Sequence, residues 1–190
     1  REARFLRGGR GGSPAAFGSI RFASTKRMPS KWCTFSNDSS PDDVVALLCE
    51  TWGLSPPPVL ISVTGAAQNL DDMRPKDRII FRRGLREAAR KTWILTGGTN
   101  TGVMKMVGNM VQEQDDIAVT CLAVAPMGCV HLHEEMLDNA GGKIFRYDDF
   151  NPPDLKTRAA LDPNHSHILL VDTGQTGKWG SEIDMRAAIE

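Results

Sequence analysis

Glycine and threonine are concentrated at residues 96–102, whose sequence is TGGTNTG. The stretch follows an apolar run, 92–95, and precedes residues 103–111, whose apolar positions share one helical face. A strand that turns at paired glycines directly into a helix presents backbone N–H groups and the positive end of the helix dipole, and this arrangement binds anions such as phosphate. The threonine hydroxyls add donors. Neither standard phosphate-loop pattern is present, so a tight turn without a ligand remains the alternative.

Two further loops of similar composition follow apolar runs. The run 59–63 ends in TGAAQN at 64–69, and the run 167–171 ends in DTGQTGKWG at 172–180. Continuous apolar strands that alternate with helices predict an α/β fold with a parallel sheet covered on both faces. Because ligands bind beyond the carboxyl ends of such strands, the three loops predict one pocket for a phosphate-bearing ligand.

The remaining elements must position these loops. The patterns predict strands at 32–35, 59–63, 92–95, 117–124 and 167–171. They predict helices from Ser40-Pro41 to about Trp52, from Pro75, over 101–113, near 132–137, and over a last segment containing Glu182 and Arg186. In the helix that begins at Pro75, we expect Phe81, Leu85 and Ala88 to face the core.

Charge divides the chain into a flank and one domain. Residues 1–31 carry eight Lys and Arg against one acidic residue, and the remainder carries fifteen against twenty-two. Residues 1–30 are rich in Arg, Gly and Ser, which predicts a disordered flank, with an organellar transit peptide as the alternative. Residues 31–190 are expected to form a single domain. Its acidic balance argues against nucleic-acid binding.

Neither cysteine usage nor hydropathy points to a secreted or membrane-spanning chain. Cys33, Cys49, Cys121 and Cys129 lack C-x-x-C spacing, which is typical of reduced intracellular thiols. No apolar run approaches the length that crosses a bilayer.

Two other features have plain and specific interpretations. The pairs at 131/133 and 165/167 are histidines, but their spacing fits no standard zinc module, so we expect structural hydrogen bonds and no metal site. The helix 75–91 carries seven Lys and Arg. A solvated face is the default, and a neighbouring subunit or an acidic lipid is the alternative.

Four blocks of the sequence resemble a known family. They are VLISVTGAAQN (59–69), ILTGGTNTGVMKMV (94–107), APMG (125–128) and NHSHILLVDTGQTGKWGSE (164–182). They resemble the N-terminal cytosolic homology region of melastatin-type TRP (TRPM) channels, which belongs to the SLOG superfamily of Rossmann-like nucleotide-binding domains. The likeness covers roughly residues 31–190, in the family's order and at about its spacing.

The resemblance implies a nucleotide-sensing regulatory domain on the cytosolic face of a membrane, with the plasma membrane expected. The domain would belong to a homotetrameric channel that transports cations such as calcium, and the membrane would be reached only through a pore region beyond Glu190. The implied ligand is ADP-ribose or a related adenine nucleotide, with no required cofactor and no chemistry. The ligand-binding residues that it implies are Thr64, Gly65, Asn69, Gly97, Gly98, Thr101, Gly102, Val103, Met104, Gly174, Thr176, Gly177 and Glu182. Met104 would pack on the base or ribose.

Three positions depart from the family pattern. Ala66 occupies the position where the family usually has a second glycine. Met127 replaces the usual Trp, and Thr173 replaces an Asn or Asp. The segment between Gly128 and Asn164 matches loosely, so Arg146, Tyr147 and Arg158 are only candidate contacts.

Two other classes of function compete with the sensor. Phosphoribohydrolases of the same superfamily use a glycine loop followed by a carboxylate, which would make Glu182 the group that stabilises an oxocarbenium-like centre. Glu182 would otherwise complement a helix dipole. An interaction scaffold with an empty cleft is the third possibility.

Overall fold

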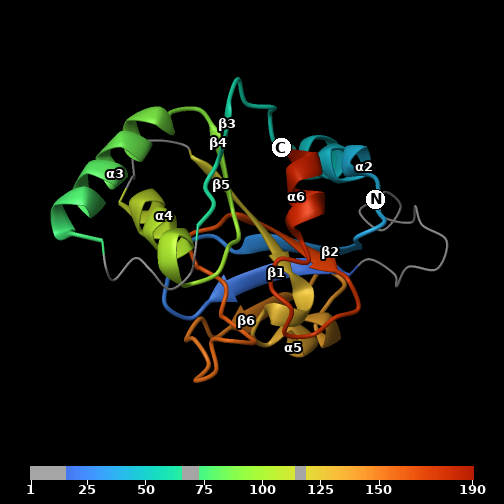
Figure 1. The fold of residues 1–190 in the computed structure, drawn as a ribbon. Coiled ribbons are helices and arrows are strands. Elements are labelled where there is room, and N and C mark those ends of the chain that lie inside the picture. The colour runs from blue at the N-terminus through green and yellow to red at the C-terminus, as the bar shows by residue number, and fades with distance from the viewer. Residues whose placement is uncertain (1–15, 66–72, 114–118) are drawn as a thin grey trace.

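The computed structural model describes residues 16–65, 73–113 and 119–190. In this part of the chain one seven-stranded sheet has the order β3-β4-β5-β7-β2-β1-β6, with helices on both faces (Figure 1). No helix among the described residues is long and apolar enough to cross a bilayer.

The strands are β1 (Phe17–Phe22), β2 (Ser30–Ser36), β3 (Leu60–Ser62), β4 (Trp93–Thr96), β5 (Thr120–Pro126), β6 (Ile144–Tyr147) and β7 (His167–Asp172). The helices are α2 (Pro41–Ala46), the π-helical turn η1 (Leu47–Thr51), α3 (Pro75–Ala88), α4 (Gly102–Gln112), the 3-10 turn η2 (Met127–Cys129), α5 (His133–Asp138) and α6 (Ile183–Ile189).

The centre of the sheet is parallel, as the apolar runs predict. β3, β4, β5, β7 and β2 pair in parallel in that order. β1 then pairs antiparallel with β2 and parallel with β6, so the whole sheet is mixed and mostly parallel. The carboxyl ends of β3, β4, β5, β7 and β2 therefore lie at one edge.

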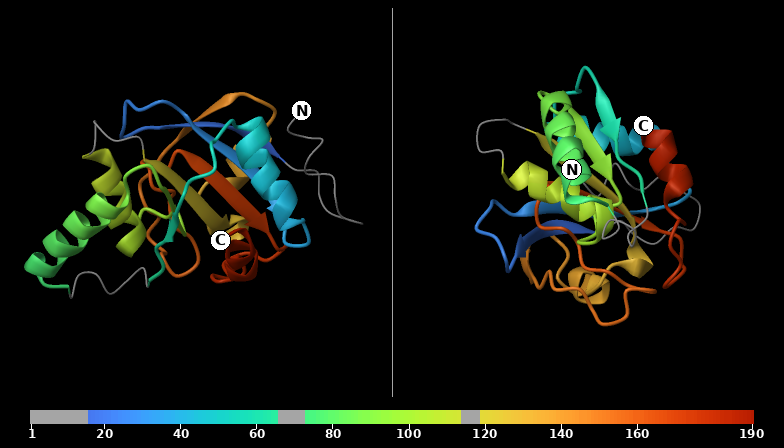
Figure 2. Two further views of the ribbon diagram at one scale, coloured as in Figure 1. Left: turned by 90° about the horizontal axis from the view of Figure 1, so that it is seen from above. Right: turned by 60° about the vertical axis from the view of Figure 1, so that its left-hand side comes forward.

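Alternate side chains of the central strands enter different cores, because successive residues of a strand point to opposite faces. Leu122 and Val124 pack with α2, η1 and α6, whereas Cys121 packs with α3 and α4. Ala123 and Ala125 pack with α5 and β1. Figure 2 shows α2 and α6 grouped together, away from α3 and α4.

The helix predictions are mostly confirmed. Pro occupies the first turn of both α2 and α3, where its missing N–H costs nothing. In α3, Leu85 is buried and Phe81 half-buried, but Ala88 is exposed and Ala89 is buried in its place. The expectation for Ala88 is wrong by one position. Ala89 keeps a helical backbone and donates its N–H to the Leu85 carbonyl, so it continues the face of Phe81 and Leu85 onto the core.

The prediction of a disordered flank over residues 1–30 is wrong for residues 17–22, which form β1. Ile20 and Phe22 are buried there against Tyr147 and its neighbours, and Ala16 donates its N–H to Thr34 Oγ1. The alternation that indicates this strand consists only of Ile20 and Phe22, and the surrounding Arg, Gly and Ser are typical of a disordered segment. Residues 1–15 lie outside the described residues.

Helix α4 packs so closely on the segment before β7 that one of its positions has no room for a side chain. A Cβ added at Gly108 would overlap the carboxylate of Asp162, which is itself 1% exposed. Gly84 of α3 provides the contrast, because a Cβ added there meets nothing within 4 Å in the described part of the chain.

We therefore expect opposite effects from the same substitution in two helices. Gly108→Ala should lower the free energy of unfolding by about 1–3 kcal/mol, because the overlap outweighs the better helix propensity of Ala. Gly84→Ala should raise it by about 0.5–1 kcal/mol. Urea unfolding followed by circular dichroism measures both. Equal effects of the two substitutions would contradict the close packing of α4.

Candidate ligand-binding site

The predicted turn from strand to helix is present at the end of β4. Thr101 is the N-cap of α4 with extended backbone, and no side chain caps the helix by a hydrogen bond among the described residues. Gly102 has φ +48°, a conformation that favours glycine. Gly65, from the loop after β3, lies against Val103, since a Cβ at Gly65 would be 3.2 Å from Val103 Cγ1. Two of the three predicted loops therefore meet at the start of α4.

Gly98 has a structural role inside this turn. Its φ is +68°, and an added Cβ would overlap the Cβ of Ala123 on β5. The N–H of Gly98 donates to Thr96 Oγ1 (2.8 Å), and its carbonyl accepts the N–H of Asp162 (2.9 Å). Gly98 is thus buried between strands, and its N–H is already engaged.

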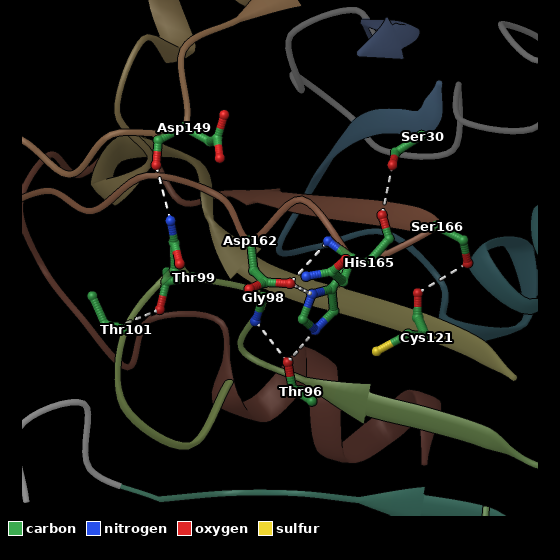
Figure 3. Close-up of polar contacts among 12 residues, drawn as sticks. Ser30, Thr96, Gly98, Thr99, Thr101, Cys121, Asp149, Asp162, His165 and Ser166 are labelled. Atoms are coloured by element: carbon green, nitrogen blue, oxygen red, sulfur yellow. Dashed lines mark hydrogen bonds and ion pairs between the residues drawn. The ribbon is translucent and has the colours of Figure 1, made fainter. Parts of the chain in front are cut away.

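A buried polar network holds the turn from the other side (Figure 3). The ring of His165 lies 3.0 Å from Asp162 Oδ1 through Nδ1 and 2.8 Å from Thr96 Oγ1 through Nε2. Burial by itself lowers the pKa of His165, but the Cys121 sulfur and the hydrogen bond to Asp162 reverse the direction and raise it. Through these two ring contacts the His165 side chain joins β4 to the segment before β7.

The rest of the glycine turn is bound to residues 149–161. The N–H of Asn100 donates to the Ala160 carbonyl (2.7 Å), and its side-chain amide donates to the Asp149 carbonyl (2.9 Å). Asn151 donates to the Asn100 carbonyl in return. Of the turn's amides, those of Gly98 and Asn100 therefore bond within the protein.

A cavity of about 660 Å³ lies at the carboxyl ends of β2 and β7. It is lined by the polar residues after both strands and by the start of α6. Asp38, Asp172 and Asp184 give it an acidic character, opposed by Lys178. Trp179 also lines it, with its indole N–H donating to the Lys156 carbonyl (2.8 Å).

The loop after β7 is packed on the turn that follows β5. A Cβ added at Gly128 would overlap the carbonyl oxygen of Gln175, and the N–H of Gly177 donates to the Gly128 carbonyl (3.1 Å). Gly174, which has φ +68°, is exposed and lines the cavity. A Cβ at Gly177 would instead be 3.3 Å from Thr157.

Glu182 is buried and is not among the residues that line the cavity. It is 8% exposed, and its Oε2 has no hydrogen-bond partner among the residues that the structure describes. Burial and the Glu182 carboxylate raise the pKa of Cys129 to about 11, against the opposing effects of the Gly177 N–H and Arg158. Glu182, Cys129 and Arg158 thus share one neighbourhood beside the glycine loop.

The structure brings the predicted ligand-binding residues together in two groups. One group lies in the loops after β3 and β4 and in the first turn of α4: Thr64, Gly65, Gly97, Gly98, Thr101, Gly102, Val103 and Met104. The other group follows β7: Gly174, Thr176, Gly177 and Glu182. Only Gly174 of the whole set lines the cavity, and Asn69 lies outside the described residues. Val103 and Met104 are 8% and 9% exposed within the core of α3 and α4, so Met104 has little surface to offer a base.

The register of the sheet explains this separation. Thr96 pairs with Ala123, which pairs with Ile168, so β7 continues four residues beyond the end of β4. At about 3.3 Å per residue this offset is about 13 Å, with two strand spacings, about 10 Å, across the sheet. The loops share an edge but are staggered along it.

Sequence reasoning missed the contribution of β2 to the cavity. Thr34, Ser36, Asn37 and Asp38 line it. The polar run that follows β2 was the available signal, of the same kind as the loops after β3, β4 and β7.

The other candidate contacts are mostly structural. Tyr147 is buried, and its hydroxyl donates to the His131 carbonyl and accepts the Leu161 N–H. Arg146 lies on β6, the outermost strand, and Arg158 alone lies near the loop after β7. Hydrogen bonds of the His133, His165 and His167 rings confirm the structural reading of those histidines.

A mostly parallel sheet with glycine loops at its carboxyl edge defines a Rossmann-like α/β domain. The chain belongs to the family described as SLOG in TRPM, whose model matches residues 30–190.

Sequence similarity to individual proteins supports the same family. The chain is 41% identical over 185 residues to transient receptor potential cation channel subfamily M member-like 2 of Nematostella vectensis. It is 38% identical over 186 residues to subfamily M member 2 of Rattus norvegicus. It is 34% identical over 181 residues to the trpm channel of Drosophila melanogaster. Each alignment covers 92% of this chain but only 12%, 12% and 9% of the relative, so the chain spans about a tenth of these proteins.

The environment of Cys129 predicts an unreactive thiol. With a pKa of about 11, only about one Cys129 in a thousand is a thiolate at pH 8, and the side chain is buried. In the folded chain, iodoacetamide should therefore modify the half-buried Cys49 and spare Cys129. Peptide mass spectrometry measures both, with the unfolded chain, in which all four cysteines react, as the control. Rapid alkylation of Cys129 in the folded chain would contradict the assigned environment.

Proposed function

We propose that this domain binds an adenine nucleotide of the ADP-ribose type and acts as a sensor without chemistry. The observation that carries the proposal is the start of α4, where the glycine turn after β4 meets Gly65 of the neighbouring loop. The N–H groups of the first helical turn and the helix dipole favour the phosphates there. Thr101, whose hydroxyl is 2.9 Å from that of Thr99, adds a donor.

The cavity beside β7 suits the other end of such a ligand. Its carboxylates disfavour phosphate but accept hydrogen bonds from ribose hydroxyls and an adenine amino group. Trp179 is 39% exposed, with its indole N–H held by Lys156, and its face offers a stacking surface for a base. Because the two groups of residues are staggered along the edge, an extended ligand with a diphosphate between two riboses fits them better than a mononucleotide.

The whole protein is proposed to be a cation channel. The names of the relatives support this, and the domain would then lie on the cytosolic face of a membrane, with the plasma membrane the expected one. Subunits of a homotetramer would be its partners, and calcium is among the cations it would pass.

Gly97 provides the test of the phosphate site. Among the described residues, a Cβ at Gly97 meets only Met104 Cγ, at 3.8 Å, so Gly97→Asp should leave the fold intact. Its carboxylate would occupy the positive end of α4 and lower the affinity for ADP-ribose at least about tenfold. Isothermal titration calorimetry on the wild-type chain and the variant measures this. Gly98→Asp is unsuitable, because it would overlap Ala123 and disturb folding.

Gly84→Asp, on the exposed face of α3, is the matched control and should bind as the wild type does. Unchanged affinity of Gly97→Asp would refute the phosphate site. If the wild-type chain binds no adenine nucleotide, the scaffold interpretation replaces the sensor.

The buried Glu182 favours one second candidate, a nucleoside-monophosphate phosphoribohydrolase. Its Oε2 lacks a described partner beside the Gly177 turn, as a carboxylate reserved for an oxocarbenium-like centre would. That activity predicts release of ribose 5-phosphate from AMP, lost in Glu182→Gln. We expect no release above the buffer blank, and release by the wild type but not by the variant would establish the enzyme.

A further inference from the structure

Ser24 lies in the exposed turn between β1 and β2, in the sequence Arg21-Phe-Ala-Ser24-Thr25-Lys26. Ser24, Arg21 and Lys26 are all exposed. Within the described chain, no carboxylate forms an ion pair with Arg21. An exposed serine with a free arginine three residues before it matches what basophilic serine/threonine kinases bind, because a guanidinium pairs with carboxylates of the kinase cleft.

The hydroxyl of Ser24 is also part of a clasp. Ser24 Oγ donates to Asp149 Oδ2, and the Ser24 N–H donates to Asp149 Oδ1 (3.1 Å). Asp149 is only 5% exposed. One buried carboxylate is thus held by both donors of one surface serine.

The clasp continues to the glycine turn. The carbonyl of Asp149 accepts the side-chain N–H of Asn100 (2.9 Å), and Asn151 donates to the Asn100 carbonyl (2.8 Å). Figure 3 shows Asp149 above the turn that carries Thr99 and Thr101. Displacement of residues 148–151 would therefore remove two of the hydrogen bonds that hold Asn100.

We propose that Ser24 is a phosphorylation site that releases this clasp. The Ser24 oxygen attacks the γ-phosphorus of ATP held by a serine/threonine kinase, the bond to the ADP oxygen breaks, and the hydroxyl proton passes to the kinase's catalytic carboxylate. The product carries a charge of about −1.5 to −2 beside the Asp149 carboxylate and has lost the donor. Repulsion separates the two segments and loosens the glycine turn through Asn100.

The proposal concerns contacts within the protein and holds whether or not a nucleotide binds. Its test incubates the full chain with MgATP and a basophilic kinase that selects Arg three residues before the acceptor. Mass spectrometry should find one phosphate on Ser24, none on Ser24→Ala, and the wild-type amount on the matched control Thr25→Ala. Arg21→Ala should slow the reaction about tenfold, because one charge-assisted contact with the kinase is lost. No incorporation, or incorporation at Thr25, would overturn the assignment.

Hydrogen–deuterium exchange then tests the coupling. Phosphorylation should speed exchange in peptides covering 97–101 and 148–151 about fivefold or more. In Asp149→Asn, which keeps one of the two acceptor oxygens but removes the charge, the increase should be smaller. Unchanged exchange in the phosphorylated wild type would show that the modification does not reach the glycine turn.

Discussion

The buried contact of His165 with Asp162 and Thr96 determines how the carboxyl edge of the sheet is built. It joins the end of β4 to the segment before β7, two parts of the chain that lie far apart in sequence. A buried imidazole needs a polar partner for each ring nitrogen, and Asp162 and Thr96 supply them. The same carboxylate leaves no room for a side chain at Gly108, so the network also determines how closely α4 approaches the sheet.

Contacts with neighbouring segments hold the glycine turn in place, and they occupy several of its backbone groups. Gly98 is packed on Ala123, its N–H is bound by Thr96, and Asn100 is held by Ala160 and Asp149. Small residues on β5 allow the turn to lie directly on the sheet. In the proposed function the phosphates would meet the start of α4, which no described side chain caps by a hydrogen bond. Pre-organised donors of this kind cost a ligand little ordering on binding.

The sheet also separates two chemically different surfaces along one edge. The start of α4 is positive by its dipole, whereas the cavity between β2 and β7 is acidic and contains Trp179. Between them lie η2 and residues 159–161. Ala159 forms a β-bridge with Val130, and Leu161 forms one with Thr99. This edge belongs to a domain of the family described as SLOG in TRPM, and the chain is similar in sequence to part of a cation channel.

The sequence alone determined the parallel strands, the order of helices and the turn at 96–102. Local patterns of apolar residues, Gly and Pro are enough to indicate which segments are buried and where the chain turns. It could not reveal β1, whose two buried residues are surrounded by Arg and Gly. Nor could it show that β7 extends four residues beyond β4, or that Gly98 faces Ala123 and Glu182 faces Cys129. Register and close approach depend on packing between segments distant in the chain, so only the tertiary structure decided which loops share a cavity.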